Sequence, residues 1–163
     1  MEGVSIVLSL IVAMDPNQGI GLNGVMPWHI KEDLQLFKQA TIHHTIIMGE
    51  TTFVGLGKVL PNRHTIVVSR NPNLKYDYEN VSVENDLIAL LKRYETSDEE
   101  VYVCGGASIY KQALPYVKRL CISHVHTAYT VDTHFPTVNW DLYEKVKEVV
   151  YDEFVYCEYL RKE

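Results

Sequence analysis

The chain has 163 residues, of which 47% are hydrophobic and 22% are charged, and this is typical of a globular protein that forms a single domain over residues 1–163. A formal net charge of −6 argues against a nucleic-acid-binding surface, although local basic residues can still hold a small anion. The three cysteines are odd in number and far apart, which indicates reduced intracellular thiols and neither disulfides nor a metal site.

A long apolar run lies near the start of the sequence. Residues 4–13 carry β-branched and apolar side chains on both faces, which predicts a central strand of a covered sheet. The run from Val4 to Met14 is too short to span a bilayer, and Glu2 stands where a signal peptide would be basic. We therefore expect a cytoplasmic protein without a membrane segment.

The next stretch, residues 15–25, contains three glycines, two asparagines and a proline. This composition predicts a long loop without secondary structure. Because the loop leads directly into a helical stretch, we interpret it as a lid over that helix. An ordinary surface loop fits the composition nearly as well.

The remaining segments alternate between short buried strands and helical patterns. The sequence predicts strands at 45–48, 65–69, 81–83, 101–104 and 120–127, helices at 30–41, 50–57, 86–94 and 107–114, an irregular loop at 129–136, and a final hairpin of strands 142–151 and 154–161. This order predicts an α/β fold. Its central sheet is mainly parallel, with about eight strands and an antiparallel C-terminal hairpin, flanked on both faces by about four helices.

The first helix has one charged residue on its apolar face. From Ile30 to Thr41 there is no helix breaker, and at about 100° per residue the apolar side chains share an arc of about 160° that includes Asp33. An ionised carboxylate in that position loses hydration and needs a partner or a raised pKa. A functional acid fits this stretch as well as a structural acid that either caps the backbone of another loop or pairs with a distant arginine.

Two strand–glycine–helix junctions, residues 48–52 and 104–108, could hold a pyrophosphate between them. Neither matches a GxGxxG or Walker motif, and glycine at such a turn often has only a steric role. Arg70 after the strand at 65–69 suits a phosphate, and Arg63 after a Pro-Asn turn suits a carboxylate. An arginine that is merely exposed on the surface would fit the sequence equally well at either position.

His124 and His126 share one face of a strand, but no third ligand occurs at a useful spacing, so we expect no metal. The sequence also lacks a Ser-His-Asp order, a CxxC pair and an HExxH motif.

A series of short motifs runs through the sequence in order: Ile20-Gly21, Met26-Pro27-Trp28, Asp33-Leu34 with Phe37, Ile47-Met48-Gly49, Thr52-Phe53, Leu60-Pro61-Asn62-Arg63, Gly105-Gly106 with Ile109-Tyr110, and Asp132-Thr133-His134-Phe135-Pro136. Each motif is common alone, but their order and spacing together are difficult to obtain by chance. In this arrangement the chain resembles the dihydrofolate reductase family over essentially its whole length.

The resemblance implies NADPH-dependent reduction of 7,8-dihydrofolate to tetrahydrofolate, a reaction that supports one-carbon metabolism and thymidylate synthesis. It implies three catalytic positions: Asp33 as the acid of the pterin pocket, Trp28 holding a water near it, and Met26 in the lid. The substrate-binding residues that it implies are Ala13, Asp33, Leu34, Phe37, Leu56, Leu60, Arg63, Cys104 and Ser123.

The resemblance also implies an NADPH site, with a cis peptide between Gly105 and Gly106 and a 2′-phosphate at Ser69 and Arg70. The cofactor-binding residues that it implies are Ala13, Ile20, Gly49, Thr51, Thr52, Ser69, Arg70, Gly105, Gly106, Ala107, Ser108, Ile109 and Tyr110. Asp132 would bond to the lid from its far side.

Four residues depart from the family pattern. Ser123 stands where the family usually has threonine, and its hydroxyl should still support Asp33. Glu50 stands at a position that is usually basic, so a preference for NADPH requires that Arg70 suffice or that Glu50 turn to solvent. Val131 replaces a common glycine beside the lid. Cys104 stands at a position that is more often isoleucine or valine, so contacts to substrate and to antifolate inhibitors differ.

Two other functions compete with this one. A riboflavin-pathway reductase domain shares the architecture, but Asp33 and Arg63 suit a folate better. A non-catalytic binding module would not oxidise NADPH. The expected partners are small molecules, with neither nucleic acid nor membrane, and the default oligomeric state is a monomer.

Overall fold

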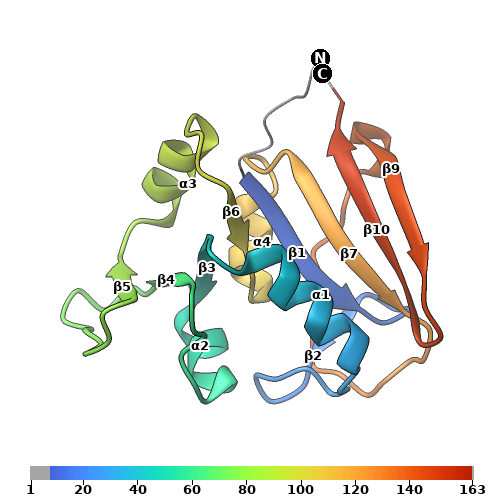
Figure 1. Cartoon of the computed structure of the whole chain (residues 1–163), viewed down its shortest axis with the longest axis horizontal. Helices are drawn as coiled ribbons and strands as arrows, with labels where there is room; N and C mark the ends of the chain where they lie inside the picture. The colour runs from blue at the N-terminus through green and yellow to red at the C-terminus, as the bar shows by residue number, and fades with distance from the viewer. Residues whose placement is uncertain (1–7, 163) are drawn as a thin grey trace.

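The computed structural model describes residues 8–162, so residues 4–7 of the first predicted strand lie outside the described part (Figure 1). Eight strands form the main sheet in the order β5-β4-β3-β6-β1-β7-β10-β9. These strands are β1 (Leu8–Met14), β3 (Thr45–Gly49), β4 (His64–Val68), β5 (Val81–Glu84), β6 (Val101–Val103), β7 (Arg119–Val125), β9 (Tyr143–Val150) and β10 (Phe154–Arg161). Neighbours from β5 to β7 pair in parallel, and β10 pairs antiparallel with both β7 and β9. The predicted mixed sheet and its final hairpin are confirmed.

Four helices accompany the sheet, as the sequence predicts, and their ends differ from the predicted ends by a few residues at most. They are α1 (Lys31–Thr41), α2 (Glu50–Leu56), α3 (Leu87–Glu95) and α4 (Ala107–Ala113), with an additional 3-10 turn η1 (Trp140–Leu142) that we did not predict. α3 begins where the Asp86 side chain accepts the amide of Ala89 at 3.1 Å. α2 ends at Gly57, whose φ of +69° favours glycine.

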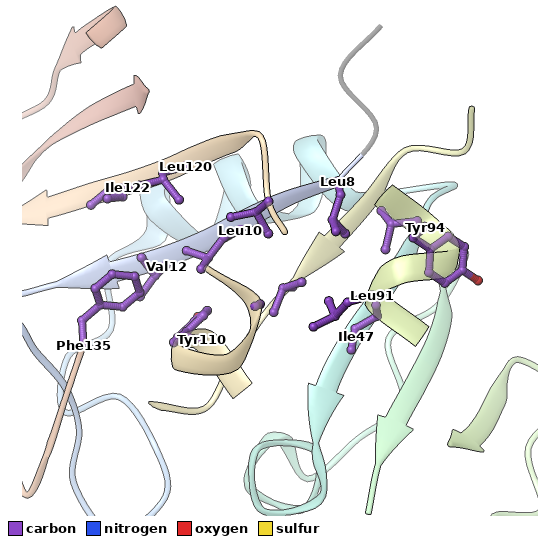
Figure 2. Packing of buried hydrophobic residues seen from close by; sticks show 14 of the residues in the cluster. Leu8, Leu10, Val12, Ile47, Leu91, Tyr94, Tyr110, Leu120, Ile122 and Phe135 are labelled. Atoms are coloured by element: carbon purple, nitrogen blue, oxygen red, sulfur yellow. The ribbon is translucent and has the colours of Figure 1, made fainter. Parts of the chain in front are cut away.

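The alternation of side chains along β1 divides the interior into two cores. Leu8, Leu10 and Val12 face the core that includes α3 and α4, whereas Ile11 and Ala13 face the core beneath α1. Figure 2 shows the first core, with Phe135 and Tyr110 beside Val12. In Figure 1, α1 lies in front of the sheet and α4 behind it. The predicted helices on both faces are therefore confirmed.

The stretch from residue 15 to residue 25 is less irregular than its composition predicts. Residues Gly19–Gly21 form a short strand, β2, which pairs antiparallel with β8 (Thr133–His134) inside the predicted loop 129–136. The prediction of two plain loops was wrong because the pairing depends on a partner strand that is distant in the sequence. The Asn23 amide also donates to Asp132 Oδ2 at 3.1 Å, so the stretch is attached at its far side as well.

The root of the same stretch is held by Asp15, a buried residue. Its Oδ1 accepts the amides of Asn17 at 2.8 Å and Gly19 at 2.7 Å, and its Oδ2 accepts the amide of Tyr129 at 3.0 Å. These three bonds hold the pKa of the Asp15 carboxyl below its usual value, against the effect of burial. The carboxylate therefore attaches two segments, the one around Asn17 and Gly19 and the one at Tyr129, to the end of β1.

Gly19 leaves no room for a side chain. A Cβ there would lie 2.7 Å from Val131 Cγ2 and 3.0 Å from Asp15 Oδ1. We expect Gly19→Ala to lower the free energy of unfolding by about 1–3 kcal/mol in urea titrations, because overpacking forces neighbours apart. Adding Val131→Ala should recover part of that loss. If the losses in free energy of unfolding from the two substitutions simply add in the double variant, this explanation is contradicted.

Candidate active site

Asp33 lies in the first turn of α1 and is half-buried. Ser123 of β7, which pairs with Ala13 of β1, donates its hydroxyl to Asp33 Oδ1 at 2.5 Å. Burial raises the pKa of the Asp33 carboxyl, and the Ser123 hydrogen bond opposes this by stabilising the ionised form. Of the two interpretations of Asp33, the structure excludes an arginine partner among the described residues.

The apolar face of α1 is only partly covered by protein. Leu34 is 38% exposed, Phe37 is half-buried, and Thr41 is the buried member of the helix. The periodicity that places Leu34 on the apolar arc identifies a face of the helix and not what covers that face. Met26 and Leu56 are exposed too, whereas Leu60 is buried. These partly exposed apolar side chains suit the walls of a ligand site.

Trp28 is buried at the start of the segment that leads into α1. Its ring packs on Tyr129 at a centroid distance of 5.2 Å. Among the described residues no group accepts a hydrogen bond from its Nε1–H. A buried donor of this kind is normally met by a water or a ligand.

Arg63 is 5% exposed and held at the far end of α1. Its Nε donates to the Pro61 carbonyl at 3.0 Å, and its Nη1 donates to Thr41 Oγ1 at 3.3 Å. Thr41 in turn donates to the Phe37 carbonyl at 2.7 Å. Burial lowers the pKa of the guanidinium, which nevertheless stays charged at any physiological pH. These bonds fix the orientation of its remaining donors.

The two glycine junctions lie side by side at the carboxyl edge of β3 and β6. The Gly49 amide donates to the Gly105 carbonyl at 2.8 Å, and the Gly105–Gly106 peptide is cis, as the resemblance implies. A Cβ on Gly106 would lie 3.2 Å from Thr52 Oγ1. The glycines therefore leave a cradle lined by backbone and by a hydroxyl, which fits a pyrophosphate group.

Several predicted cofactor residues surround this cradle. Ala107, Ser108 and Ile109 form the first turn of α4, and Tyr110 donates to the Ile11 carbonyl of β1 at 2.7 Å. Thr51 is exposed on α2, and Ile20 is buried in β2.

The next strand, β4, leads to Ser69 and the exposed Arg70. Ser69 Oγ donates to Glu50 Oε1 at 2.8 Å. Of the two alternatives for Glu50, the structure shows a residue that is exposed but whose Oε1 is also held by the Ser69 hydroxyl.

Sequence reasoning missed three residues of the site: Asp15, Thr41 and Tyr129. The Asp-Pro-Asn order at residue 15 is a turn signal that could have identified Asp15. No local pattern marks Thr41 as the partner of Arg63 or Tyr129 as the partner of Trp28, since both contacts are tertiary.

His124 lies on the opposite face of the sheet from Ser123. Its Nε2 is 2.9 Å from the Tyr159 hydroxyl, and it borders a hollow of about 710 Å³ that Trp140 and Lys145 also line. Within residues 8–162, no three potential ligand side chains gather as they would around a metal. All three cysteines are free thiols. No helix in the same range has the length and apolar character that crossing a membrane requires.

The fold and the site define a class: an α/β enzyme with an anion cradle at the carboxyl edge of parallel strands and a half-buried acid on an adjacent helix. A family model described as dihydrofolate reductase matches residues 7–158. The dihydrofolate reductase type 3 of Salmonella typhimurium is 36% identical over 157 residues, which is 94% of this chain and 95% of that protein. That of Bacillus subtilis (strain 168) is 39% identical over 138 residues, which is 83% and 80% of the two chains.

The same relationship holds in three dimensions. The structure of a dihydrofolate reductase from Enterococcus faecalis, complexed with NADP(H) and RAB-propyl, matches with a TM-score of 0.86 and 34% identity, covering 96% of this chain and 97% of that one. This chain belongs to the dihydrofolate reductase family.

The raised pKa of Asp33 has a consequence for stability. Below the usual pKa of an aspartate, the carboxyl is neutral in both the folded and the unfolded chain. As the pH rises through the raised folded value, the folded chain is destabilised because it must ionise a partly dehydrated group. We therefore expect the free energy of unfolding of Asp33→Asn to exceed that of the wild type at about pH 8, and the excess to disappear below about pH 4.

Urea titrations at both pH values measure this difference. Glu32→Gln, at the exposed neighbouring position of the same helical turn, is the matched control and should show no such pH dependence. An Asp33→Asn variant that is less stable than the wild type at the higher pH would contradict the assigned cause.

Proposed function

We infer that this chain reduces 7,8-dihydrofolate to 5,6,7,8-tetrahydrofolate with NADPH. The observation that carries this function is the half-buried Asp33 carboxylate, hydrogen-bonded to Ser123 beside the partly exposed apolar face of α1. Family membership agrees with it and does not favour the riboflavin-pathway alternative.

We assign the pterin to the space between Asp33 and the apolar side chains of α1. Its amino group and ring nitrogen are donors that the ionised carboxylate accepts, and Ser123 keeps that carboxylate in position. The negative charge makes N5 of the pterin more basic, so that a water can protonate it. The buried Nε1–H of Trp28 is a suitable donor to that water.

The glutamate end of dihydrofolate is assigned to Arg63. Because its Nε and one Nη1 bond already fix the guanidinium plane, the remaining donors can meet the α-carboxylate in a planar, bidentate geometry. Phe37, Leu56 and Leu60 then lie along the middle of the molecule as apolar walls.

NADPH, when bound, supplies the hydride that C6 of dihydrofolate receives. The glycine cradle of Gly49, Gly105 and Gly106 with Thr52 suits its pyrophosphate. The stretch from Gly19 to Met26 serves as a lid that excludes water from the reacting rings, and Asp132 holds it from its far side. We further propose one domain, a monomeric state, a cytoplasmic location and binding of antifolate inhibitors at the pterin site.

Loss of NADPH absorbance at 340 nm on mixing with dihydrofolate tests the activity itself. We expect Asp33→Asn to lower turnover at neutral pH by about 100-fold or more, which is the usual contribution of a positioned acid–base group. Its residual rate should rise as the pH falls, because solvent then protonates more of the substrate. Glu32→Gln is the control.

Turnover of a ribosylaminopyrimidine in place of dihydrofolate would support the riboflavin-pathway alternative. If neither substrate oxidises NADPH, the result would support the alternative of a non-catalytic binding module. A wild-type rate in Asp33→Asn would exclude the proposed role of the carboxylate.

We expect Arg63→Lys to raise the KM for dihydrofolate about tenfold, because an ammonium cannot form the bidentate pair. The KM for NADPH should stay unchanged. The matched substrate is dihydropteroate, which lacks the glutamate and should bind both forms of the protein equally. An equal rise in KM for dihydropteroate would show that Arg63 acts on the fold and not on the carboxylate.

A further inference from the structure

A hydrogen-bonded polar cluster lies where β3 and β4 end. Ser69 Oγ donates to Glu50 Oε1 at 2.8 Å and accepts the Asn71 amide at 3.1 Å. The side-chain amide of Asn85 donates to the carbonyl groups of Ser69 at 2.8 Å and Asn71 at 3.1 Å. Ser69 is 6% exposed. Its hydroxyl is therefore held by two hydrogen bonds and does not rotate freely.

The donor of Ser69 is already used. A serine hydroxyl has one hydrogen, and here that hydrogen points to the Glu50 carboxylate. A phosphate at this position would meet the negative charge of Glu50 and would find its nearest donor occupied. A ribose hydroxyl would instead find an acceptor, because Glu50 keeps a second oxygen, Oε2, beyond the one that Ser69 occupies.

The cluster also has a cation at its border. Arg70 follows Ser69 directly and is exposed, so its guanidinium can reach a phosphate from the solvent side. In nucleotide sites at the carboxyl edge of parallel strands, a carboxylate takes the ribose 2′-hydroxyl of NAD and an arginine takes the 2′-phosphate of NADP. This chain carries both groups: Glu50 is hydrogen-bonded to Ser69, and Arg70 follows Ser69 in the chain.

We propose that Glu50 is a specificity-determining residue, and that the Glu50–Ser69 pair accepts the 2′-hydroxyl of NADH while Arg70 accepts the 2′-phosphate of NADPH. The chain then uses NADH alongside NADPH, with only a small preference between them. This rests on the proposed function, because it places the adenosine ribose of the cofactor beside Ser69. Either cofactor gives one hydride to C6, and solvent gives one proton to N5, so the reaction is balanced identically.

Two nucleotides that differ only at the ribose test this without any reduction step. Isothermal titration calorimetry gives the Kd of 5′-AMP and of adenosine 2′,5′-bisphosphate for the whole chain. In the wild type we expect the two Kd values to agree within about tenfold. Glu50→Gln should tighten binding of the bisphosphate about tenfold and weaken 5′-AMP about twofold, because it removes a repulsive charge and a strong acceptor.

Arg70→Gln should have the opposite effect, weakening the bisphosphate about tenfold while 5′-AMP changes less than twofold. Glu32→Gln is the matched control, since Glu32 is also an exposed first-turn glutamate, on α1. It should alter neither Kd. The ratio of kcat/KM for NADPH and NADH should move in parallel with the two Kd values in each variant.

A wild-type preference for the bisphosphate above about 100-fold that Glu50→Gln leaves unchanged would overturn this proposal. Binding of neither nucleotide would overturn it as well. Failure of the proposed function gives a different result. The Kd values of the two nucleotides would then follow the expected pattern, but dihydrofolate would oxidise neither NADPH nor NADH.

Discussion

The hydrogen bond from Ser123 to Asp33 joins the first turn of α1 to the centre of the sheet, and the site depends on it. Burial alone would favour a protonated carboxyl, whereas the hydroxyl of Ser123 stabilises the ionised form. The acid is therefore kept partly dehydrated and still able to accept hydrogen bonds from a ligand. Ser123 pairs with Ala13 of β1, so the hydrogen bond connects α1 to the two central strands β1 and β7.

The ligand-binding groups converge because parallel strands end at one edge. β1, β3, β4 and β6 are parallel neighbours, so the residues that follow them gather at their carboxyl ends. Side chains are excluded at both junctions, because a Cβ on Gly49 would lie 3.2 Å from Ile109 Cγ1 and one on Gly105 would lie 3.3 Å from the Tyr110 ring. The same edge carries Glu50 and Ser69, so the position that we propose for discrimination between cofactors lies one strand away from the cradle that suits the pyrophosphate.

Much of this arrangement could be predicted from the sequence. Buried β-branched runs and glycine junctions indicate the alternation of strands and helices, and the 3.6-residue period places Asp33 on the apolar face of its helix. Periodicity could not show that Leu34 would stay exposed, because it does not report what covers a face. The pairing of β2 with β8 and the bond from Arg63 to Thr41 depend on residues brought together only by the complete fold.

Family resemblance supplied the rest of the candidate site, and it was least informative where this chain departs from the pattern. Glu50 is an example: its identity predicts repulsion of a phosphate, but only the structure shows that Ser69 holds the carboxylate in place. Side-chain direction at an exposed helix start has no sequence signal.

The contacts of Asp15 link two parts of the molecule that the chain separates. Its carboxylate holds the amide of Gly19 and that of Tyr129, and the Tyr129 ring packs against Trp28. The contacts of Asp15 thus connect the segment near Gly19 with the buried indole of Trp28. A substitution at Asp15 would therefore alter the packing around Trp28 although the two side chains do not touch, because Tyr129 lies between them.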